Sequence, residues 1–417
     1  MHLTIVAYGT WGDVRPGIAL GLALKKAGYV VRLIVTEDFA RWVKDIGLDI
    51  HMLPVNKFEV MKRVSSRTNP LQVMAAIRKE IGPALFRAGR DLVTMAADTD
   101  GFLVNEWLLG LVSGITESRR LKLVQISMQP EIRTGEMAIP TMPALPDWLP
   151  FRGVYNLLSY DFAHNLRWYS YVHTINSLRK TLMDLPPLSS RGYLDLLDQT
   201  PSITLLSQHV IPRPKDWHVR HHLTGFLFYD DVCWRPPTDL VKFIQDGEAP
   251  VYIGFGSMHD RDPERTTKMI LEAVKSTQSR AVLYKGWANL GRSKLPKTIC
   301  PLDYAPHNWL FPQMAAVVHH AGSGTSAAAL RAGVPSVPVP HSGDQPFWAR
   351  RLYQLGAGTR PLPRSRLSAD ALASRITQAV HEPEIRKRAA ELSARISGED
   401  GATRTVAVIN EILNNSD

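Results

Sequence analysis

The chain has 417 residues, a formal net charge of +10 and a pI of about 9.5. At about 150 residues per domain, this length predicts two domains. A hydrophobic content of 45% with 21% charged residues excludes a disordered or fibrous chain. The two cysteines, Cys233 and Cys300, are too few for a disulfide framework, so we expect a cytoplasmic protein.

The positive charge favours anionic partners, namely diphosphates, membrane surfaces or nucleic acid, and does not choose among them. Residues 57–90 carry eight basic side chains against two acidic ones, interleaved with apolar residues. This pattern fits either an amphipathic surface in peripheral contact with the inner membrane face or a solvated helix face beside a core. No apolar run reaches the roughly 20 residues that cross a bilayer, and no nucleic-acid-binding motif is present.

The first fifty residues alternate between strand and helix patterns. A strand at 3–8, a glycine-containing loop, a helix at 16–27 and a strand at 30–35 predict a βαβ unit. Further short apolar runs predict strands of the same parallel sheet at 101–105, 123–127 and 203–207. Residues 129–195 are rich in proline and aromatic side chains, which fits either the lining of a large apolar pocket or ordinary packing.

The loop from Gly9 to Pro16 joins the first strand to the first helix, the position at which open α/β sheets bind ligands. Asp13 in this loop can take the proton from an attacking hydroxyl, which is the work of a general base. The alternative, in which Asp13 is a helix N-cap, is favoured when this loop is considered alone. Asp98 and Asp100 have the D-x-D spacing of some metal sites but precede a strand, so we interpret them as a surface turn.

A second alternation of strands and helices begins near residue 251, with strands expected at 251–255, 281–284, 316–319 and 336–339. Glycine, aspartate and proline at 224–237 predict a linker, and the pattern is helical after residue 363. We therefore expect an α/β fold with two Rossmann-like domains, at 1–223 and 238–398, followed by a C-terminal helix at 399–417.

Two glycine loops follow strands of this second domain. Ser257, after the first strand, can donate a hydrogen bond to a phosphate oxygen. The run from His319 to Ser326 is more specific, because its glycines let backbone amides approach a diphosphate at a helix N-terminus. His320 can add a hydrogen bond or a charge, whereas we assign His319, which points to the opposite face of the strand, to the core.

Asp344 and Gln345 follow the last strand and open another helix. A carboxylate and an amide in one short span supply acceptors and donors for adjacent sugar hydroxyls. Considered alone, Asp344 is better explained as an N-cap. The combination with the preceding glycine loop on successive strand ends is what predicts a pocket for a sugar diphosphate. No residue cluster has metal-ligand spacing.

The segments 305–313, 319–325, 333–335 and 343–348 resemble the donor-binding signature of glycosyltransferase family 1. The sequence is most similar to the sterol 3-beta-glucosyltransferase branch, with vancomycin-type antibiotic glycosyltransferases close behind. The resemblance includes the loops at 12–16 and 254–257 but not the region from about 57 to 200. It implies a GT-B fold, in which an acceptor domain at 1–223 and a nucleotide-sugar domain at 238–398 face each other and the last helix crosses back to the first domain.

The resemblance also implies roles for individual residues. Asp13 matches the catalytic base. The donor is expected to contact Gly12, Ser257, Tyr304, Ala305, His307, His320, Gly322, Ser323, Gly324, Thr325, Asp344 and Gln345. The acceptor is expected to contact Trp11, Trp107, Met137, Trp148 and Phe151. Tyr304 stands where plant relatives carry tryptophan, which leaves open whether the donor base is uracil or thymine.

Enzymes of this kind are inverting and metal-independent and need no cofactor beyond the sugar donor. The implied reaction transfers a hexose, with glucose from UDP-glucose as the first choice, to a hydroxyl of a sterol, polyketide, flavonoid or other lipid-like alcohol. A nucleotide-sugar 2-epimerase of the same fold is disfavoured by the C-terminal segments. A catalytically silent nucleotide-sugar sensor is the alternative of another class.

Overall fold

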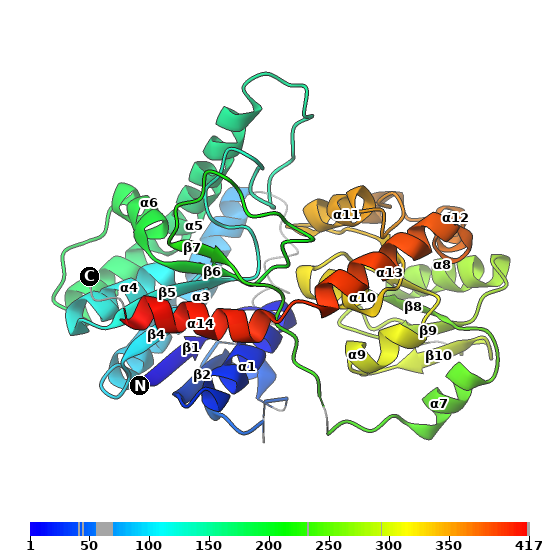
Figure 1. Cartoon of the computed structure of the whole chain (residues 1–417), viewed down its shortest axis with the longest axis horizontal. Helices are drawn as coiled ribbons and strands as arrows, with labels where there is room; N and C mark the ends of the chain where they lie inside the picture. The colour runs from blue at the N-terminus through cyan, green and yellow to red at the C-terminus, as the bar shows by residue number, and fades with distance from the viewer. Residues whose placement is uncertain (41, 44–45, 56–69, 232, 293, 415–417) are drawn as a thin grey trace. The chain divides into compact units, whose positions relative to one another are not determined.

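The computed structural model describes residues 1–40, 42–43, 46–55, 70–231, 233–292 and 294–414. It divides into two compact units, Met1–Tyr229 with Asp400–Asp417, and Asp230–Glu399. Each unit is a parallel α/β structure with helices on both faces of its sheet (Figure 1). This architecture confirms the expected pair of Rossmann-like folds. The boundary between the units falls inside the stretch 224–237.

The first unit has a parallel sheet with the order β3-β2-β1-β4-β5-β6-β7. Its strands are β1 (His2–Val6), β2 (Val30–Thr36), β3 (Asp49–Leu53), β4 (Gly101–Val104), β5 (Lys122–Ser127), β6 (Ser202–Thr204) and β7 (His221–Leu223). The central strands are buried on both faces, in keeping with their mostly apolar sequences. Strands β3 and β7 were not expected from the sequence, because β3 is half-polar and β7 has only three residues, two of them histidine.

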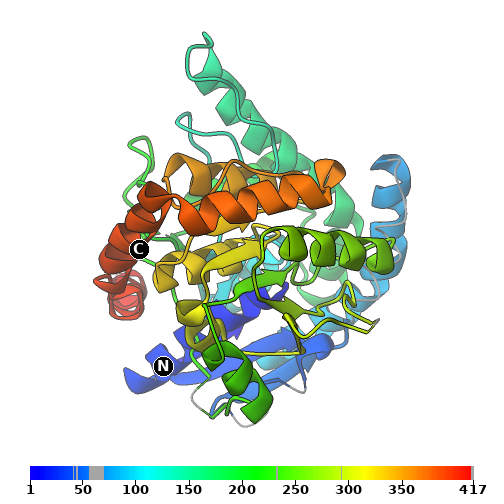
Figure 2. The same ribbon diagram turned by 90° about the vertical axis from the view of Figure 1, so that its right-hand side faces the viewer.

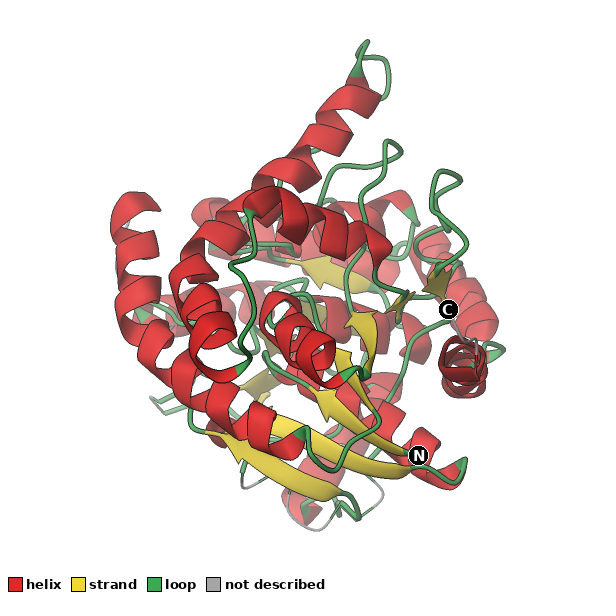
Figure 3. Cartoon of the chain, turned by 90° about the vertical axis from the view of Figure 1, so that its left-hand side faces the viewer, coloured by secondary structure: helices red, strands yellow, loops and turns green. Residues whose placement is uncertain are grey.

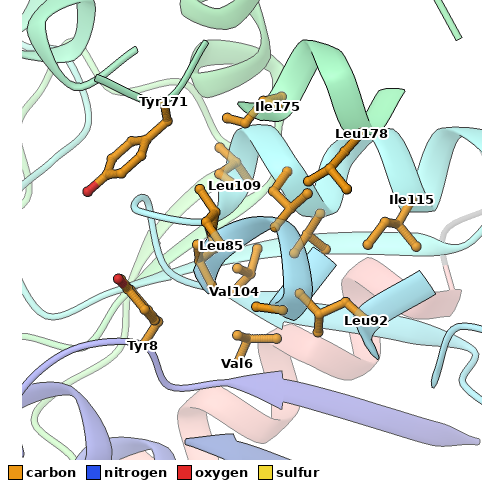
Figure 4. Close-up of a cluster of buried hydrophobic side chains, with 14 of the residues drawn as sticks. Val6, Tyr8, Leu85, Leu92, Val104, Leu109, Ile115, Tyr171, Ile175 and Leu178 are labelled. Atoms are coloured by element: carbon orange, nitrogen blue, oxygen red, sulfur yellow. The ribbon is translucent and has the colours of Figure 1, made fainter. Parts of the chain in front are cut away.

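The helices of this unit are α1 (Trp11–Lys26), α3 (Pro70–Met95), α4 (Leu109–Arg119), α5 (Arg152–Leu182), α6 (Ser190–Gln199) and α14 (Gly401–Asn414). Adjacent residues of β1 enter different cores: Val6 packs with α3, α4 and α5, and Ile5 packs with α1 and α14. Figure 4 shows the first of these cores, which contains Leu85, Leu109 and Leu178. Part of the basic segment 57–90 lies outside the described residues.

Helix α14 completes the first unit although it comes last in the chain. Thr405 and Thr224 share a hydrogen bond of 2.7 Å between their hydroxyls, and Tyr29 bonds the side chain of Asn410. Gly401 begins the helix where a Cβ would come within 2.5 Å of the Phe226 carbonyl oxygen. Because the helix approaches the backbone of the segment after β7 so closely, this position requires glycine.

The second unit has a parallel sheet with the order β10-β9-β8-β11-β12 (Figures 1 and 2). Its strands are β8 (Val251–Gly254), β9 (Ala281–Tyr284), β10 (Ile299–Leu302), β11 (Ala316–His319) and β12 (Ser336–Pro338). Its helices are α7 (Thr238–Gln245), α8 (Pro263–Ser276), α9 (His307–Leu310), α10 (Ser323–Ala332), α11 (Gln345–Gln354), α12 (Ala369–His381) and α13 (Pro383–Ser397). The sequence did not predict β10, whose apolar pattern is interrupted by Pro301. None of the described helices is both long and apolar enough to cross a membrane.

Candidate active site

The loop after β1 ends in a capping box that contains Asp13. The Thr10 hydroxyl accepts a 3.2 Å hydrogen bond from the Gly12 amide, and Asp13 Oδ2 accepts one of 2.8 Å from the Thr10 amide. Helix α1 therefore begins at Trp11, five residues before the expected start at 16. Pro16 lies inside it. The interpretation of Asp13 as the N-cap is wrong: Thr10 is the N-cap, and Asp13 is the third residue of the helix.

The position of the Asp13 carboxylate depends on Gly9. A Cβ on Gly9 would lie only 1.8 Å from Asp13 Oδ2, so any side chain there would displace the carboxylate. The loop thus holds Asp13 at the carboxyl edge of the sheet with one oxygen engaged by backbone. The positive end of the α1 dipole favours an anion at this place.

A second carboxyl group, Glu106, was missed by the sequence analysis. It follows β4, the neighbour of β1, and is buried. The Ser127 hydroxyl at the end of β5 donates to its Oε2 at 3.3 Å, and the hydroxyl of Tyr193 donates to its carbonyl oxygen at 3.4 Å. Asn105 ties the same turn to the β1 loop by a 2.6 Å bond to the Tyr8 carbonyl. A carboxylate directly after a buried strand was the available signal.

Glu106 belongs to a buried charge cluster. Arg167 of α5 pairs with Glu131 at 2.9 Å, and His164 Nε2 lies 3.4 Å from the same carboxylate oxygen. Burial, the charge of Glu131 and the charge of Asp13 raise the pKa of Glu106 well above the ordinary carboxyl range. The charge of Arg167 keeps the pKa of Glu131 low despite its burial. At neutral pH the cluster therefore holds a protonated Glu106 beside an ionised Glu131–Arg167 pair.

The predicted acceptor residues occupy different environments. Trp107 follows Glu106 and lies under the Arg167 guanidinium, 4.7 Å from the ring centroid. Trp11 packs edge-on against Phe39 at 4.8 Å. Met137 is half-buried in the loop before α5, whereas Trp148 and Phe151 are exposed on the projecting tip that precedes this helix. Of the five, Trp11 and Trp107 are the ones in segments that directly follow strands of the sheet.

In the second unit, His320 follows β11 and lies between two glycines. A Cβ on Gly256, after the neighbouring strand β8, would come within 2.7 Å of the His320 ring, and a Cβ on Gly322 within 2.5 Å. Gly256 has φ of +59° and Ala321 has φ of +62°, so both turns use the left-handed region. Any larger residue at either glycine would move the imidazole.

The His320 ring is buried, and its Nδ1 atom has no hydrogen-bond partner among the residues that the structure describes. Burial, with a smaller contribution from His341, lowers the pKa of His320 to about 3. The imidazole is therefore neutral at physiological pH and offers a hydrogen bond instead of a charge. Gly322 is the N-cap of α10, so the first amides of that helix, from Ser323 to Thr325, and its dipole supply the anion-binding potential. His319 is fully buried, as expected of a core residue.

The loops beside this centre carry the other predicted donor residues. Ser257 is half-buried after β8, and Asp344 is the N-cap of α11 after β12, without a side-chain capping bond. Gln345 is buried, and its Oε1 accepts from the amides of His341 and Ser342 at 2.8 and 3.2 Å. Gln345 thus shapes the turn on which Asp344 stands.

The last group follows β10 at the opposite edge of the sheet. The Tyr304 hydroxyl donates to Asp231 at 3.4 Å, and Ala305 is buried. The His307 ring stacks on Phe311 with centroids 4.3 Å apart. Because the strands are parallel, all these loops lie at the carboxyl ends of the strands. The strands that carry them follow one another across the sheet in the order β10, β8, β11, β12, with β9 between β10 and β8.

The D-x-D pair is engaged by neighbouring groups. Asp98 pairs with Arg32 at 2.8 Å, and Asp100 accepts a 2.7 Å bond from the His2 amide. These contacts place the pair in the turn before β4, as expected. Within the described part of the chain, no group of three or more histidine, cysteine, aspartate or glutamate residues is arranged to hold a metal ion.

The fold is that of the GT-B glycosyltransferases. Solved structures of this class share the fold at low identity: the glycosyltransferase of kitacinnamycin superposes with a TM-score of 0.71 at 17% identity over 99% of both chains. The glycosyltransferase VinC in complex with dTDP superposes with a TM-score of 0.69 at 17% identity over 100% of both chains.

Sequence relatives identify the family. Residues 3–85 match the glycosyltransferase family 28 N-terminal domain, and residues 268–412 match the erythromycin biosynthesis protein CIII-like C-terminal domain. A sterol 3-beta-glucosyltransferase of Arabidopsis thaliana is 31% identical over 99% of this chain and 68% of its own length. The O-mycaminosyltylonolide 6-deoxyallosyltransferase of Streptomyces fradiae is 30% identical over 99% of this chain and 97% of its own.

The chain therefore belongs to the glycosyltransferase family that includes these sterol and macrolide enzymes. It is a hexosyltransferase. The resemblance to the sterol and antibiotic branches is confirmed. The chain spans about two thirds of the length of the plant sterol enzymes and 28% of a sterol 3-beta-glucosyltransferase of Yarrowia lipolytica, with which it shares 30% identity.

Proposed function

We propose that the chain transfers a hexose from a nucleoside diphosphate sugar to a hydroxyl of a lipophilic alcohol, with inversion and without a metal. The observation that carries this proposal is the buried His320 ring beside the N-terminus of α10, whose Nδ1 has no partner among the described residues. A neutral imidazole beside the first turn of α10, between two glycines at which any Cβ would displace it, can donate a ring N–H to a diphosphate oxygen.

The order of loops along the second sheet supports the donor assignment. Tyr304 and His307 after β10 would contact the nucleobase, and Ser257, His320 and the first amides of α10 would hold the two phosphates. Asp344 after β12 would bind sugar hydroxyls. A nucleotide sugar laid along the sheet edge meets these groups in the same order. UDP-glucose is the first candidate, and a dTDP-sugar is the alternative.

Asp13 would act as the general base. As the acceptor oxygen forms its bond to the anomeric carbon, its proton passes to the Asp13 carboxylate. The bond from that carbon to the β-phosphate oxygen breaks, and its electron pair leaves with the nucleoside diphosphate. Attack from the face opposite the leaving group turns an α-linked donor into a β-linked product. The amides of α10 would stabilise the leaving charge that a metal ion carries in other transferases.

The acceptor class is proposed from the named relatives and from apolar side chains of the first unit. The sterol and O-mycaminosyltylonolide acceptors in the names of those relatives are large alcohols with few charges. Trp107, Trp11 and Met137 would supply apolar contacts for such a molecule. The proposed acceptors are therefore sterols, polyketides and flavonoids.

The test is acceptor-dependent release of nucleoside diphosphate from UDP-glucose and dTDP-glucose, with EDTA present, across sterol, macrolide and flavonoid alcohols. The anomeric coupling constant in the proton spectrum of the product reports its stereochemistry. The proposal predicts a β-linked product that forms equally well in EDTA. An α-linked product, or turnover only with small hydrophilic sugars, would refute it. Donor binding without turnover for any acceptor would favour the nucleotide-sugar sensor.

A further inference from the structure

The first half of α5 has its polar face buried and its apolar face exposed. The buried face carries Asn156, Ser159, Tyr160 and His164, which bond the preceding loop: Asn156 donates to the Gly135 carbonyl at 2.8 Å, Ser159 accepts from the Ile139 amide at 3.0 Å, and Tyr160 donates to the Pro130 carbonyl at 3.1 Å. A helix that packs only on its own protein normally has the reverse polarity.

The exposed face forms a continuous outer stripe. Its helical residues are spaced three or four apart and therefore share one side of the helix: Val154, Leu158, Phe162, Leu166 and Tyr169. Phe151, the N-cap of the helix, is exposed at the start of this stripe. Trp148 precedes the stripe in the loop. This end of α5 projects from the rest of the first unit (Figures 1 and 3). Trp148 exposes 79% and Phe151 83% of its surface, so the projecting tip presents the two most exposed of these side chains.

The stripe leaves a large apolar area exposed to water, and such an area marks a binding surface. The tip is also free of net charge. Within residues 137–160 the charged side chains are Asp147 and Arg152, and these two form an ion pair with each other. A neutralised pair enters an apolar medium at lower cost than two separate ions.

We propose that the outer stripe of α5 docks the enzyme on an anionic lipid bilayer, with Trp148 and Phe151 seated at the interface between headgroups and acyl chains. Trp, Tyr and Phe favour this interface, and aliphatic side chains along a helix face add buried apolar area. The net charge of +10 draws the chain to anionic lipids, which a neutral stripe cannot do by itself.

Membrane docking goes beyond the proposed transfer reaction and is measured without it. Sedimentation of the full chain would be compared between phosphatidylcholine vesicles and vesicles that also contain phosphatidylglycerol. The test variant is Leu158→Ser with Phe162→Ser, two exposed stripe residues that have no place in the proposed active site. The matched control is Val219→Ser with Tyr353→Ser, which removes two comparably exposed apolar side chains elsewhere.

The expected result is binding to the anionic vesicles that weakens by about tenfold or more in the stripe variant, because the apolar area available for burial falls. The control variant binds as the wild type does, and an unchanged circular dichroism spectrum and thermal unfolding profile show that both variants are folded. The proposal would be overturned if the stripe variant bound the anionic vesicles as well as the wild type does, or if the wild type bound neither kind of vesicle. Light scattering that shows a dimer dissociated by the stripe substitutions without any vesicle binding would also overturn it.

Discussion

Asp13 Oδ2 accepts a 2.8 Å hydrogen bond from the backbone amide of Thr10, and the Thr10 hydroxyl in turn caps helix α1. The proposed base is thus the third residue of the helix and a member of the capping box. Its carboxylate serves the helix and the reaction at the same time. This double role explains why the sequence favours a structural assignment when the loop is considered alone.

Thr10→Ala is expected to lower both stability and kcat. Loss of the cap costs about 0.5–2 kcal/mol, and fraying of the first turn leaves Asp13 less well oriented. Thr10→Ser keeps the accepting hydroxyl and should retain both properties. Thermal unfolding and steady-state kinetics measure the two effects. If serine behaved like alanine, the cap would not be what orients Asp13.

Gly322→Ala is expected to weaken donor binding. The added Cβ would lie 2.5 Å from His320 Nε2, so the imidazole must move away from the N-terminus of α10. We expect a loss of about tenfold in UDP affinity, equivalent to about 1.4 kcal/mol. Gly398→Ala is the control, because its Cβ meets the nearest atom at 3.5 Å. Isothermal titration calorimetry with UDP distinguishes the two, and equal affinities would contradict the assigned site.

Donor affinity should not depend on the ionisation of His320 near neutral pH. Burial lowers the pKa of this imidazole to about 3, so it stays neutral from pH 5.5 to 8. A histidine with its ordinary pKa of about 6.5 would become charged over this range as the pH falls, and would bind the diphosphate more tightly. His320→Gln, which keeps a hydrogen-bonding group, should show the same flat profile as the wild type. Affinity that rises in the wild type alone below pH 7 would show a charged His320.

Because of Glu106, the free energy of unfolding should decrease as the pH rises above neutrality. Its pKa in the folded protein is raised above the unfolded value, so its contribution is full below the unfolded pKa and is lost as the pH rises through the folded pKa. A tenfold change in the acid dissociation constant on folding corresponds to about 1.4 kcal/mol of stability. Between pH 6 and 9, the melting temperature of the wild type should therefore fall more steeply than that of Glu106→Gln.

The control for Glu106 is Glu272→Gln, which alters an exposed carboxylate 4.0 Å from Lys268. Its melting profile should run parallel to that of the wild type. Parallel profiles for Glu106→Gln and the wild type would mean that Glu106 is already ionised at neutral pH.

The sequence predicted the strand ends that carry the candidate site, because buried parallel strands are apolar runs and glycine follows them where backbone must approach a ligand. The sequence thus predicted the positions of Ser257, His320 and Gly322 after these strands. The start of α1 was misplaced because Pro16 resembles a first helical residue, whereas the capping box formed by Thr10 and Asp13 fixes the start earlier.

Other features depend on contacts between distant parts of the chain. The cluster around Glu106 joins β4, the loop after β5 and helix α5, and no local pattern relates these segments. The outer stripe of α5 was missed for a different reason. Periodicity shows that Leu158 and Phe162 share a helix face, but it does not show which face is buried, and here bonds from Asn156 and Tyr160 to the preceding loop decide this.

The central claim is that Asp13 removes the acceptor proton. The most direct measurement is kcat for acceptor-dependent release of nucleoside diphosphate by the wild type and by Asp13→Asn. Asparagine keeps an oxygen to accept from the Thr10 amide, so the fold and UDP affinity should be retained. The account predicts a loss of about 10²–10⁴ in kcat, the usual contribution of a general base. A variant that turned over at the wild-type rate with the same UDP affinity would contradict it.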